Sequence, residues 1–158
     1  MKRLLLLGGG HAHVKVLADL AERPLAGWDV RLVTPYRRQI YSGMLPGWIA
    51  GHYPLQACAP PLTVVGVGAL PLDEMSARAA VAFHQTAGSA LDLQRNALHC
   101  ADGSGFHFDL LSIDTGPMPA LDRLPGAEDH ALLIRPIEGF VAAWPALVDR
   151  ILVRCRRF

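Results

Sequence analysis

A glycine turn near the N-terminus limits the folds open to this chain more than any other feature. Leu4–Leu7 is continuously apolar, Gly8–Gly10 follows it at once, and a helix-like pattern begins near His11. An apolar run without polar alternation is typical of a parallel strand buried on both faces. Gly8 permits a sharp turn, and Gly10 has no Cβ that would keep a ligand from the backbone. The pattern therefore predicts a strand, a tight turn and a helix whose first N–H groups point at the turn.

This order is the opening of a Rossmann unit, in which the helix N-terminus receives the pyrophosphate of a dinucleotide. Gly8 and Gly10 match the first two glycines of the G-x-G-x-x-G/A fingerprint, but the third small position falls on His13. A histidine there is expected to point away from the strand or to hold the helix further out. A simpler interpretation stays open at this point, an ordinary strand–turn–helix that uses its glycines only for the turn.

The following residues complete one βαβ unit. A helix is predicted from His11 to about Arg23 because apolar residues recur at helical spacing, and Pro24 and Gly27 end it. A second strand is predicted over Asp29–Thr34. The crossover between the two strands is expected to be right-handed.

The end of the second strand lacks the carboxylate that usually binds a ribose in this fold. Thr34, Pro35, Arg37 and Arg38 lie there instead. One interpretation is that Thr34 and the backbone hold the ribose. A second is that Arg37 or Arg38 faces the 2′-phosphate of NADP, and a third is that both arginines are exposed loop residues.

The segment from Ile40 to Tyr53 is rich in small and apolar residues, which suits backbone lying against a flat apolar ligand. Ser42 is a predicted N-cap and Gly51 a predicted residue just past a helix end. Pro46 argues against a long regular helix here.

These residues carry a resemblance to a known family. Gly8–Val14, Tyr41–Gly47 and Gly51–Tyr53 resemble the N-terminus of FAD-dependent pyridine nucleotide-disulfide oxidoreductases. The branch is similar to type II NADH dehydrogenases, and some of its members are fused to selenide, water dikinase. A histidine at the third small position is usual in that branch. The resemblance implies the N-terminal portion of an α/β, Rossmann-like, three-layer FAD/NAD(P)-binding fold with a small antiparallel β layer.

By this resemblance the cofactor is FAD, with NAD(P)H as co-substrate of the full-length protein. The first motif would cradle the FAD pyrophosphate and the second would pass near the flavin. No catalytic residue and no metal ligand are assigned. The predicted cofactor-binding residues are Gly8, Gly10, His11, Ala12, Thr34, Pro35, Ser42, Gly43, Met44, Leu45, Pro46, Gly88, Thr115 and Gly116.

Residues 54–80 depart from the family pattern. The family has a helix at this point, whereas prolines and β-branched residues over Ala59–Gly68 favour loop and strand. Cys58 lies at the edge of this segment. It is interpreted as a buried, inert thiol rather than a redox-active one, because no neighbour that would lower its pKa is visible in the sequence.

From Val81 the family pattern returns. Residues 81–116 are predicted to form a β meander, which resembles the small antiparallel layer, followed by a buried return strand. The expected strands are Val81–Thr86, Ala90–Leu93, Ala97–Cys100, Phe106–Phe108 and Asp109–Asp114. By resemblance the backbone of Gly88 would meet the adenine, and Thr115-Gly116 would lie close to FAD. The family has Ala-Thr-Gly at that point, and here Asp114 replaces the alanine.

Residues 117–158 are predicted to form a loop and then an amphipathic helix over Ile137–Cys155, in which Pro145 causes a kink or a split. The sequence contains one dinucleotide fingerprint and no second G-x-G-x-x-G. The NAD(P)H domain of the family is therefore expected to be absent, and this chain alone is not expected to be a competent enzyme.

Composition limits the classes of binding partner that the chain is expected to have. The chain has 158 residues, 51% hydrophobic and 18% charged, and a formal net charge of +1, so a globular domain without a nucleic-acid partner is predicted. No stretch approaches the ~18 apolar residues of a membrane span. Three scattered cysteines indicate the reducing cytoplasm, with no zinc spacing and no cysteine pair for disulfide reduction. Peripheral membrane association is open if the acceptor is a quinone.

Three functions follow from these observations. The first is the FAD-binding part of a flavin-dependent NAD(P)H oxidoreductase, in which electrons pass from nicotinamide to flavin to an unknown acceptor. The second is a single-site NADP-binding Rossmann protein that uses Arg37 or Arg38. The third is a non-catalytic half-domain with an apolar surface that forms a homo-oligomer.

Overall fold

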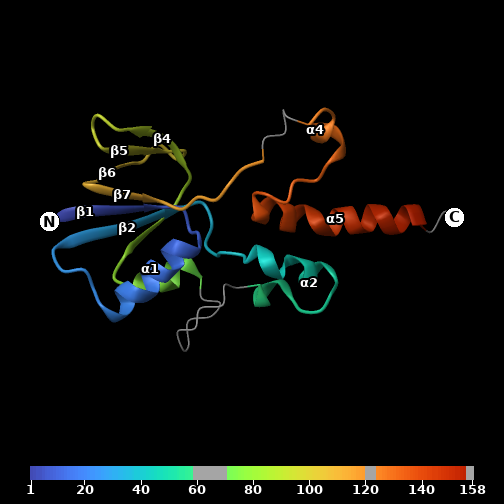
Figure 1. Cartoon of the computed structure of the whole chain (residues 1–158), viewed down its shortest axis with the longest axis horizontal. Coiled ribbons are helices and arrows are strands. Elements are labelled where there is room, and N and C mark those ends of the chain that lie inside the picture. The colour runs from blue at the N-terminus through green and yellow to red at the C-terminus, as the bar shows by residue number, and fades with distance from the viewer. Residues whose placement is uncertain (59–70, 120–123, 156–158) are drawn as a thin grey trace. The chain divides into compact units, whose positions relative to one another are not determined.

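The computed structural model of the chain describes residues 1–58, 71–119 and 124–155 (Figure 1). Contacts divide the chain into two compact units, Met1–Gly116 and Pro117–Phe158. All the predicted cofactor-binding residues belong to the first unit. The strand expected within 59–68 lies outside the described residues.

The first unit is built on a parallel sheet with the strand order β3-β2-β1-β7. Its strands are β1 (Lys2–Leu7), β2 (Trp28–Thr34), β3 (Ala82–Gln85) and β7 (Leu110–Ile113). The apolar run at the N-terminus thus forms a central strand, as its continuous hydrophobicity predicts. A second, antiparallel sheet is formed by β4 (Gly88–Asp92), β5 (Ala97–Cys100) and β6 (Gly105–His107).

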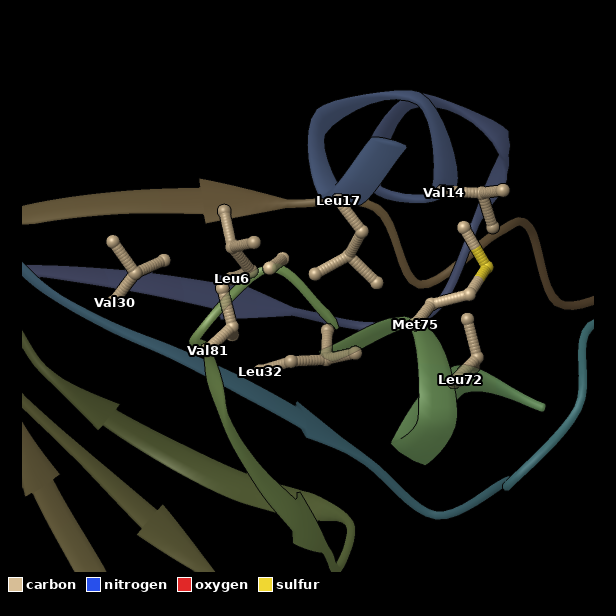
Figure 2. Packing of buried hydrophobic residues seen from close by; sticks show 9 residues of the cluster. Leu6, Val14, Leu17, Val30, Leu32, Leu72, Met75 and Val81 are labelled. Carbon is tan, nitrogen blue, oxygen red and sulfur yellow. The ribbon is translucent and has the colours of Figure 1, made fainter. Parts of the chain in front are cut away.

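Helices cover one face of the parallel sheet. These are α1 (His11–Glu22) and α3 (Leu72–Arg78). Figure 2 shows Leu17 of α1 directed toward the strands that carry Leu6 and Leu32, and Met75 of α3 directed toward Val14 of α1. The full cluster of buried residues on this face is Leu6, Val14, Leu17, Val30, Leu32, Leu72, Met75, Ala79 and Val81.

The antiparallel sheet packs on the opposite face of the parallel sheet. Leu5, Leu7 and Val33 contact residues of β5 and β6, including Leu98 and Phe106. Because side chains alternate along a strand, Leu5 and Leu7 face one layer and Leu6 the other. The predicted three-layer α/β Rossmann-like fold with a small antiparallel layer is confirmed.

Two sequence-based expectations in this region were wrong. The strand expected over Val81–Thr86 is β3, and it pairs in parallel with β2 instead of joining the antiparallel layer. Ser42 is not an N-cap: it opens a 3₁₀ turn, η1 (Ser42–Met44), whose cap position is Tyr41, and its side chain makes no capping bond. In addition, α3 was not predicted.

The chain after β2 begins with short helical elements. The turn η1 leads directly into α2 (Leu45–Ile49), and η2 (Leu55–Ala57) follows. Pro46 lies in the first turn of α2, where its missing N–H is not needed, and the helix has only 5 residues. Gly51 has φ +77° and ends the segment as predicted.

The second unit contains α4 (Ala127–His130) and α5 (Ile137–Cys155). The predicted bounds of α5 are confirmed. Pro145 lies inside one continuous helix, so of the two predicted alternatives the split is wrong and the kink stays a prediction. Phe140 is buried, and its ring lies 5.6 Å from that of Trp144.

Candidate functional site

The turn between β1 and α1 requires glycine at its first position. Gly8 has φ +95°, which side-chain-bearing residues rarely adopt, and its N–H donates to the Val33 carbonyl at 2.8 Å. A Cβ on Gly8 would also lie closer than 3.0 Å to the backbone of Asp114 and Thr115. Gly8 therefore lets the carboxyl ends of β1 and β7 approach each other closely.

Gly10 makes room for a carboxylate. A Cβ at Gly10 would overlap the side-chain carboxyl of Asp114. That carboxylate accepts hydrogen bonds from the backbone N–H groups of Ala12, at 2.9 Å, and His13, at 3.2 Å. Asp114 therefore lies against the N-terminus of α1, where two N–H donors and the helix dipole stabilise negative charge.

The backbone N–H groups of Ala12 and His13 are the kind of donor that a pyrophosphate oxygen needs. In the structure they already bind the carboxylate of Asp114. The N–H of His11 is not among the donors that Asp114 uses. The turn fits a phosphate group once the Asp114 side chain has moved aside.

His13 lies between the helix and the sheet. It is only 1% exposed, and its ring Nδ1 lies 2.6 Å from the Gly8 carbonyl oxygen while Nε2 lies 2.8 Å from the Ser112 hydroxyl. Because a carbonyl only accepts, Nδ1 carries the proton, and a neutral ring accepts the Ser112 hydroxyl proton at Nε2. Of the two alternatives for His13, the one in which it points away from the strand was wrong, because two hydrogen bonds satisfy its ring inside the interface. The other, that it holds the helix further out, stays a prediction.

The end of β2 brings Thr34 beside the turn. Thr34 is buried, its hydroxyl accepts a hydrogen bond of 3.4 Å from the Tyr36 N–H, and Pro35 after it is exposed. A Cβ on Gly9 would lie 3.4 Å from the Thr34 hydroxyl oxygen. Gly8, Gly9 and Thr34 thus meet at the carboxyl edge of the parallel sheet, where open α/β folds bind ligands.

The two arginines after β2 differ. Arg37 forms an ion pair with Asp73 in the first turn of α3, and its carbonyl accepts the Leu72 N–H at 2.5 Å. The hydrogen bond and positive charge of Arg37 lower the pKa of Asp73, although burial acts in the opposite direction. Arg38 is exposed.

The second sequence motif contacts the first through His11. The Gln39 side-chain nitrogen lies 2.9 Å from His11 Nδ1, and the rings of His11 and Tyr41 meet edge to face at 5.2 Å. The Gln39 side-chain oxygen is buried and has no hydrogen-bond partner among the residues described. An acceptor without a donor beside the α1 N-terminus is a group that a ligand could satisfy.

Glycines of the second motif make room for tyrosine rings. A Cβ at Gly43 would crowd the ring of Tyr41, and one at Gly47 would overlap the ring of Tyr53. The Tyr53 hydroxyl donates to the Met44 carbonyl at 2.6 Å. The tyrosine rings therefore pack against a compact turn. This turn consists of Ser42, Gly43, Met44, Leu45 and Pro46, of which Leu45 is buried and the others are more exposed.

The remaining predicted residues follow β7 and open β4. Thr115 and Gly116 come directly after the close approach of Asp114 to Gly8, and Gly116 has φ +78°. Gly88 begins β4 opposite Cys100, and a Cβ there would lie 3.0 Å from Leu7 and Leu98 side chains. The roles of all these residues toward a ligand remain predictions.

Four residues that matter here were missed or left without a role by sequence reasoning: Gln39, Tyr53, Ser112 and Asp114. The replacement of alanine by Asp114 was visible in the sequence. Its position under α1 was not, because it depends on contacts between residues about a hundred positions apart.

The surroundings of Cys58 and Cys100 disfavour the thiolate form of each side chain. Cys58 and Cys100 are free and buried, and burial raises the pKa of each thiol. The interpretation of Cys58 as a buried thiol is confirmed. Within residues 1–58, 71–119 and 124–155 there is no cluster of three potential metal ligands. In the same ranges, every helix is too short or too polar to cross a bilayer.

Comparison with known proteins identifies the fold. No protein-family model matches the chain. The sulfide:quinone oxidoreductase of Aquifex aeolicus superposes with a TM-score of 0.72 and 17% identity, over 94% of this chain and 32% of that one. A ferredoxin reductase from Rhodopseudomonas palustris gives 0.68 and 17%, over 94% and 35%. NDH2 from Plasmodium falciparum gives 0.67 and 16%, over 98% and 30%.

This chain therefore spans about a third of the length of these oxidoreductases. The likeness confirms, at the level of the fold, the resemblance inferred from the glycine turn and the Tyr41–Gly47 motif.

Proposed function

We propose that this chain is the FAD-binding part of a flavin-dependent NAD(P)H oxidoreductase similar to NADH dehydrogenases. The observation that carries the proposal is the glycine turn, in which Gly8 lets the end of β7 approach closely and Gly10 leaves room for an anion at the N-terminus of α1. Solved oxidoreductases with the same fold support it. Two free, buried thiols suit the reducing cytoplasm.

Each part of the site has a role in this proposal. Gly8, Gly10, His11 and Ala12 would receive the pyrophosphate, and Thr34 and Pro35 would lie beside the ribose. Residues 42–46 and Thr115-Gly116 would lie near the flavin, and Gly88 near the adenine. FAD supplies the redox chemistry when bound, and the protein contributes binding, orientation and electrostatics. NAD(P)H would bind to a part of the full-length protein outside this chain, and the acceptor is unassigned.

The test is to identify what the protein carries. The chain is purified without added cofactor and denatured, and the released small molecule is identified by absorbance and mass spectrometry. Near-stoichiometric FAD is the expected result. If the purified protein carries nothing, FAD is titrated onto it, and absence of binding at millimolar FAD contradicts the proposal.

A single-site NADP protein is the less favoured alternative. Arg37 is paired with Asp73, so a 2′-phosphate would have to compete with that carboxylate for the guanidinium. Arg37 and Arg38 are both exposed, and this alternative retains both as candidate cations. Replacing both arginines and finding the NADPH affinity unchanged would exclude it.

Self-association of a non-catalytic half-domain has one observation in its favour. β7 is an edge strand of the parallel sheet, and Leu110 and Ile113 on it are 52% and 57% exposed. An exposed edge strand with apolar side chains is a template for pairing with another chain. Light scattering tests this alternative, and a monomer at high concentration contradicts it.

A further inference from the structure

The carboxylate of Asp114 lies where an anionic ligand of this turn would bind. It accepts the N–H groups of Ala12 and His13 and fills the space that the missing Cβ of Gly10 leaves open. A phosphate oxygen that accepts the same two N–H groups would have to take the place of the carboxylate oxygen. The two groups are both anions, so they repel each other as well as overlap.

The backbone of Asp114 has no freedom to withdraw. Its N–H donates to the Leu7 carbonyl at 2.8 Å, and its carbonyl accepts the Gly10 N–H at 3.1 Å. These bonds tie the residue to both sides of the turn. Only rotation of the side chain can therefore move the carboxylate away from α1, and that rotation breaks two charge-assisted hydrogen bonds.

We propose that Asp114 is an internal competitor for the dinucleotide site: its carboxylate caps α1 and must be displaced before a pyrophosphate can bind. The inference rests on the proposed function for the identity of the ligand. It assigns Asp114 a role that lowers affinity for the dinucleotide while keeping the helix N-terminus capped in its absence.

The first test measures FAD affinity by quenching of flavin fluorescence on the full chain, its Asp114→Ala variant and its Asp114→Asn variant. Asp114→Ala is expected to bind FAD about tenfold more tightly or better, which corresponds to about 1.4 kcal/mol. Asp114→Asn keeps the shape without the charge and is expected to lie in between. Asp109→Asn, at the opposite end of β7, controls for overall charge and is expected to bind like the wild type.

The second test uses inorganic pyrophosphate and needs no flavin. Millimolar pyrophosphate is expected to raise the unfolding temperature of Asp114→Ala by about 3 °C and that of the wild type by much less. Equal shifts in the two proteins, or none in the variant, would overturn the inference. If Asp114→Ala does not fold, the same comparison is made with Asp114→Asn.

The two tests separate the inference from the proposed function. Equal FAD affinity of the wild type and Asp114→Ala overturns the role of Asp114 and leaves the FAD proposal standing. Selective stabilisation of Asp114→Ala by pyrophosphate, with FAD binding in neither protein, supports the competition at α1 and contradicts the FAD proposal.

Discussion

The imidazole of His13 and the hydroxyl of Ser112 join the first turn of α1 to β7 by a hydrogen bond of 2.8 Å. Small residues at this position of the fingerprint let the helix pack directly on the strand. Here a buried ring fills the interface and is held at both nitrogens, by Gly8 at one end and Ser112 at the other. The turn, the helix and β7 are therefore fixed to one another by a polar contact.

Replacing Ser112 by alanine is expected to destabilise the protein by about 1–3 kcal/mol, because Nε2 of His13 would remain buried without a partner. The measurement is urea unfolding followed by circular dichroism. Ser89→Ala is the control, since the Ser89 hydroxyl bonds the His99 carbonyl at an exposed position and should cost well under 1 kcal/mol. Equal costs for the two variants would contradict the role of His13.

Much of this fold follows from local sequence pattern. β1 is predicted to be buried on both faces because Leu4–Leu7 contains no polar residue. Helices α1 and α5 are predicted from apolar residues at helical spacing. The turn at Gly8 could be predicted because the chain must reverse there. These features depend on residues that are neighbours in sequence.

What could not be predicted depends on distant partners. The burial of His13 requires Ser112, and the position of Asp114 requires Ala12, so neither has a local signal. β3 joins β2 instead of the antiparallel layer, which hydrophobic pattern alone does not specify. Helix α3 was missed because it has only 7 residues, too few for a clear helical repeat.

Gly8→Ala is expected to be among the most damaging single-methyl additions in the chain. It combines a positive φ with backbone atoms that cannot move aside, and we expect it to cost more than about 3 kcal/mol. Gly27 also has a positive φ, of +80°, but nothing lies within 4 Å of a Cβ there. Gly27→Ala should therefore cost only the strain of about 1–2 kcal/mol. Thermal unfolding of both variants measures the difference, and similar melting temperatures would show that the close approach is unimportant.

The pair formed by Asp109 and Arg3 makes a pH-dependent contribution to stability. Side-chain and backbone hydrogen bonds from Arg3 lower the pKa of Asp109 to about 2. Because the folded-state pKa is below the ordinary value, the contribution is complete above about pH 5 and is lost as the pH falls through about 2. The stability gap between the wild type and Asp109→Asn should be constant from pH 7 to 5 and then narrow. A gap that does not depend on pH contradicts this assignment.

His84 should act in the same direction as Asp109, but at a higher pH. Burial and the positive charge of Arg31 lower the pKa of His84, whose ring lies 4.5 Å from that of Phe106. The neutral ring is favoured in the folded state, so stability falls as the pH decreases from about 6.5 through the folded-state pKa. His84→Phe should reduce the loss of stability between pH 7 and 5, while the exposed control His99→Gln should retain it. Chemical denaturation at several pH values gives both slopes.

Gly10 and Asp114 should be energetically coupled. Gly10 has φ −70°, which alanine adopts without strain, so the cost of Gly10→Ala comes from the carboxylate that its Cβ displaces. In the wild type the substitution removes the cap of α1 and is expected to cost about 1–2 kcal/mol. In the Asp114→Ala background the space is empty, and the same substitution should cost less than about 0.5 kcal/mol. A double-mutant cycle by urea unfolding measures the coupling. If Gly10→Ala costs the same in both backgrounds, the carboxylate does not occupy the space beside Gly10 in solution, and α1 has another cap.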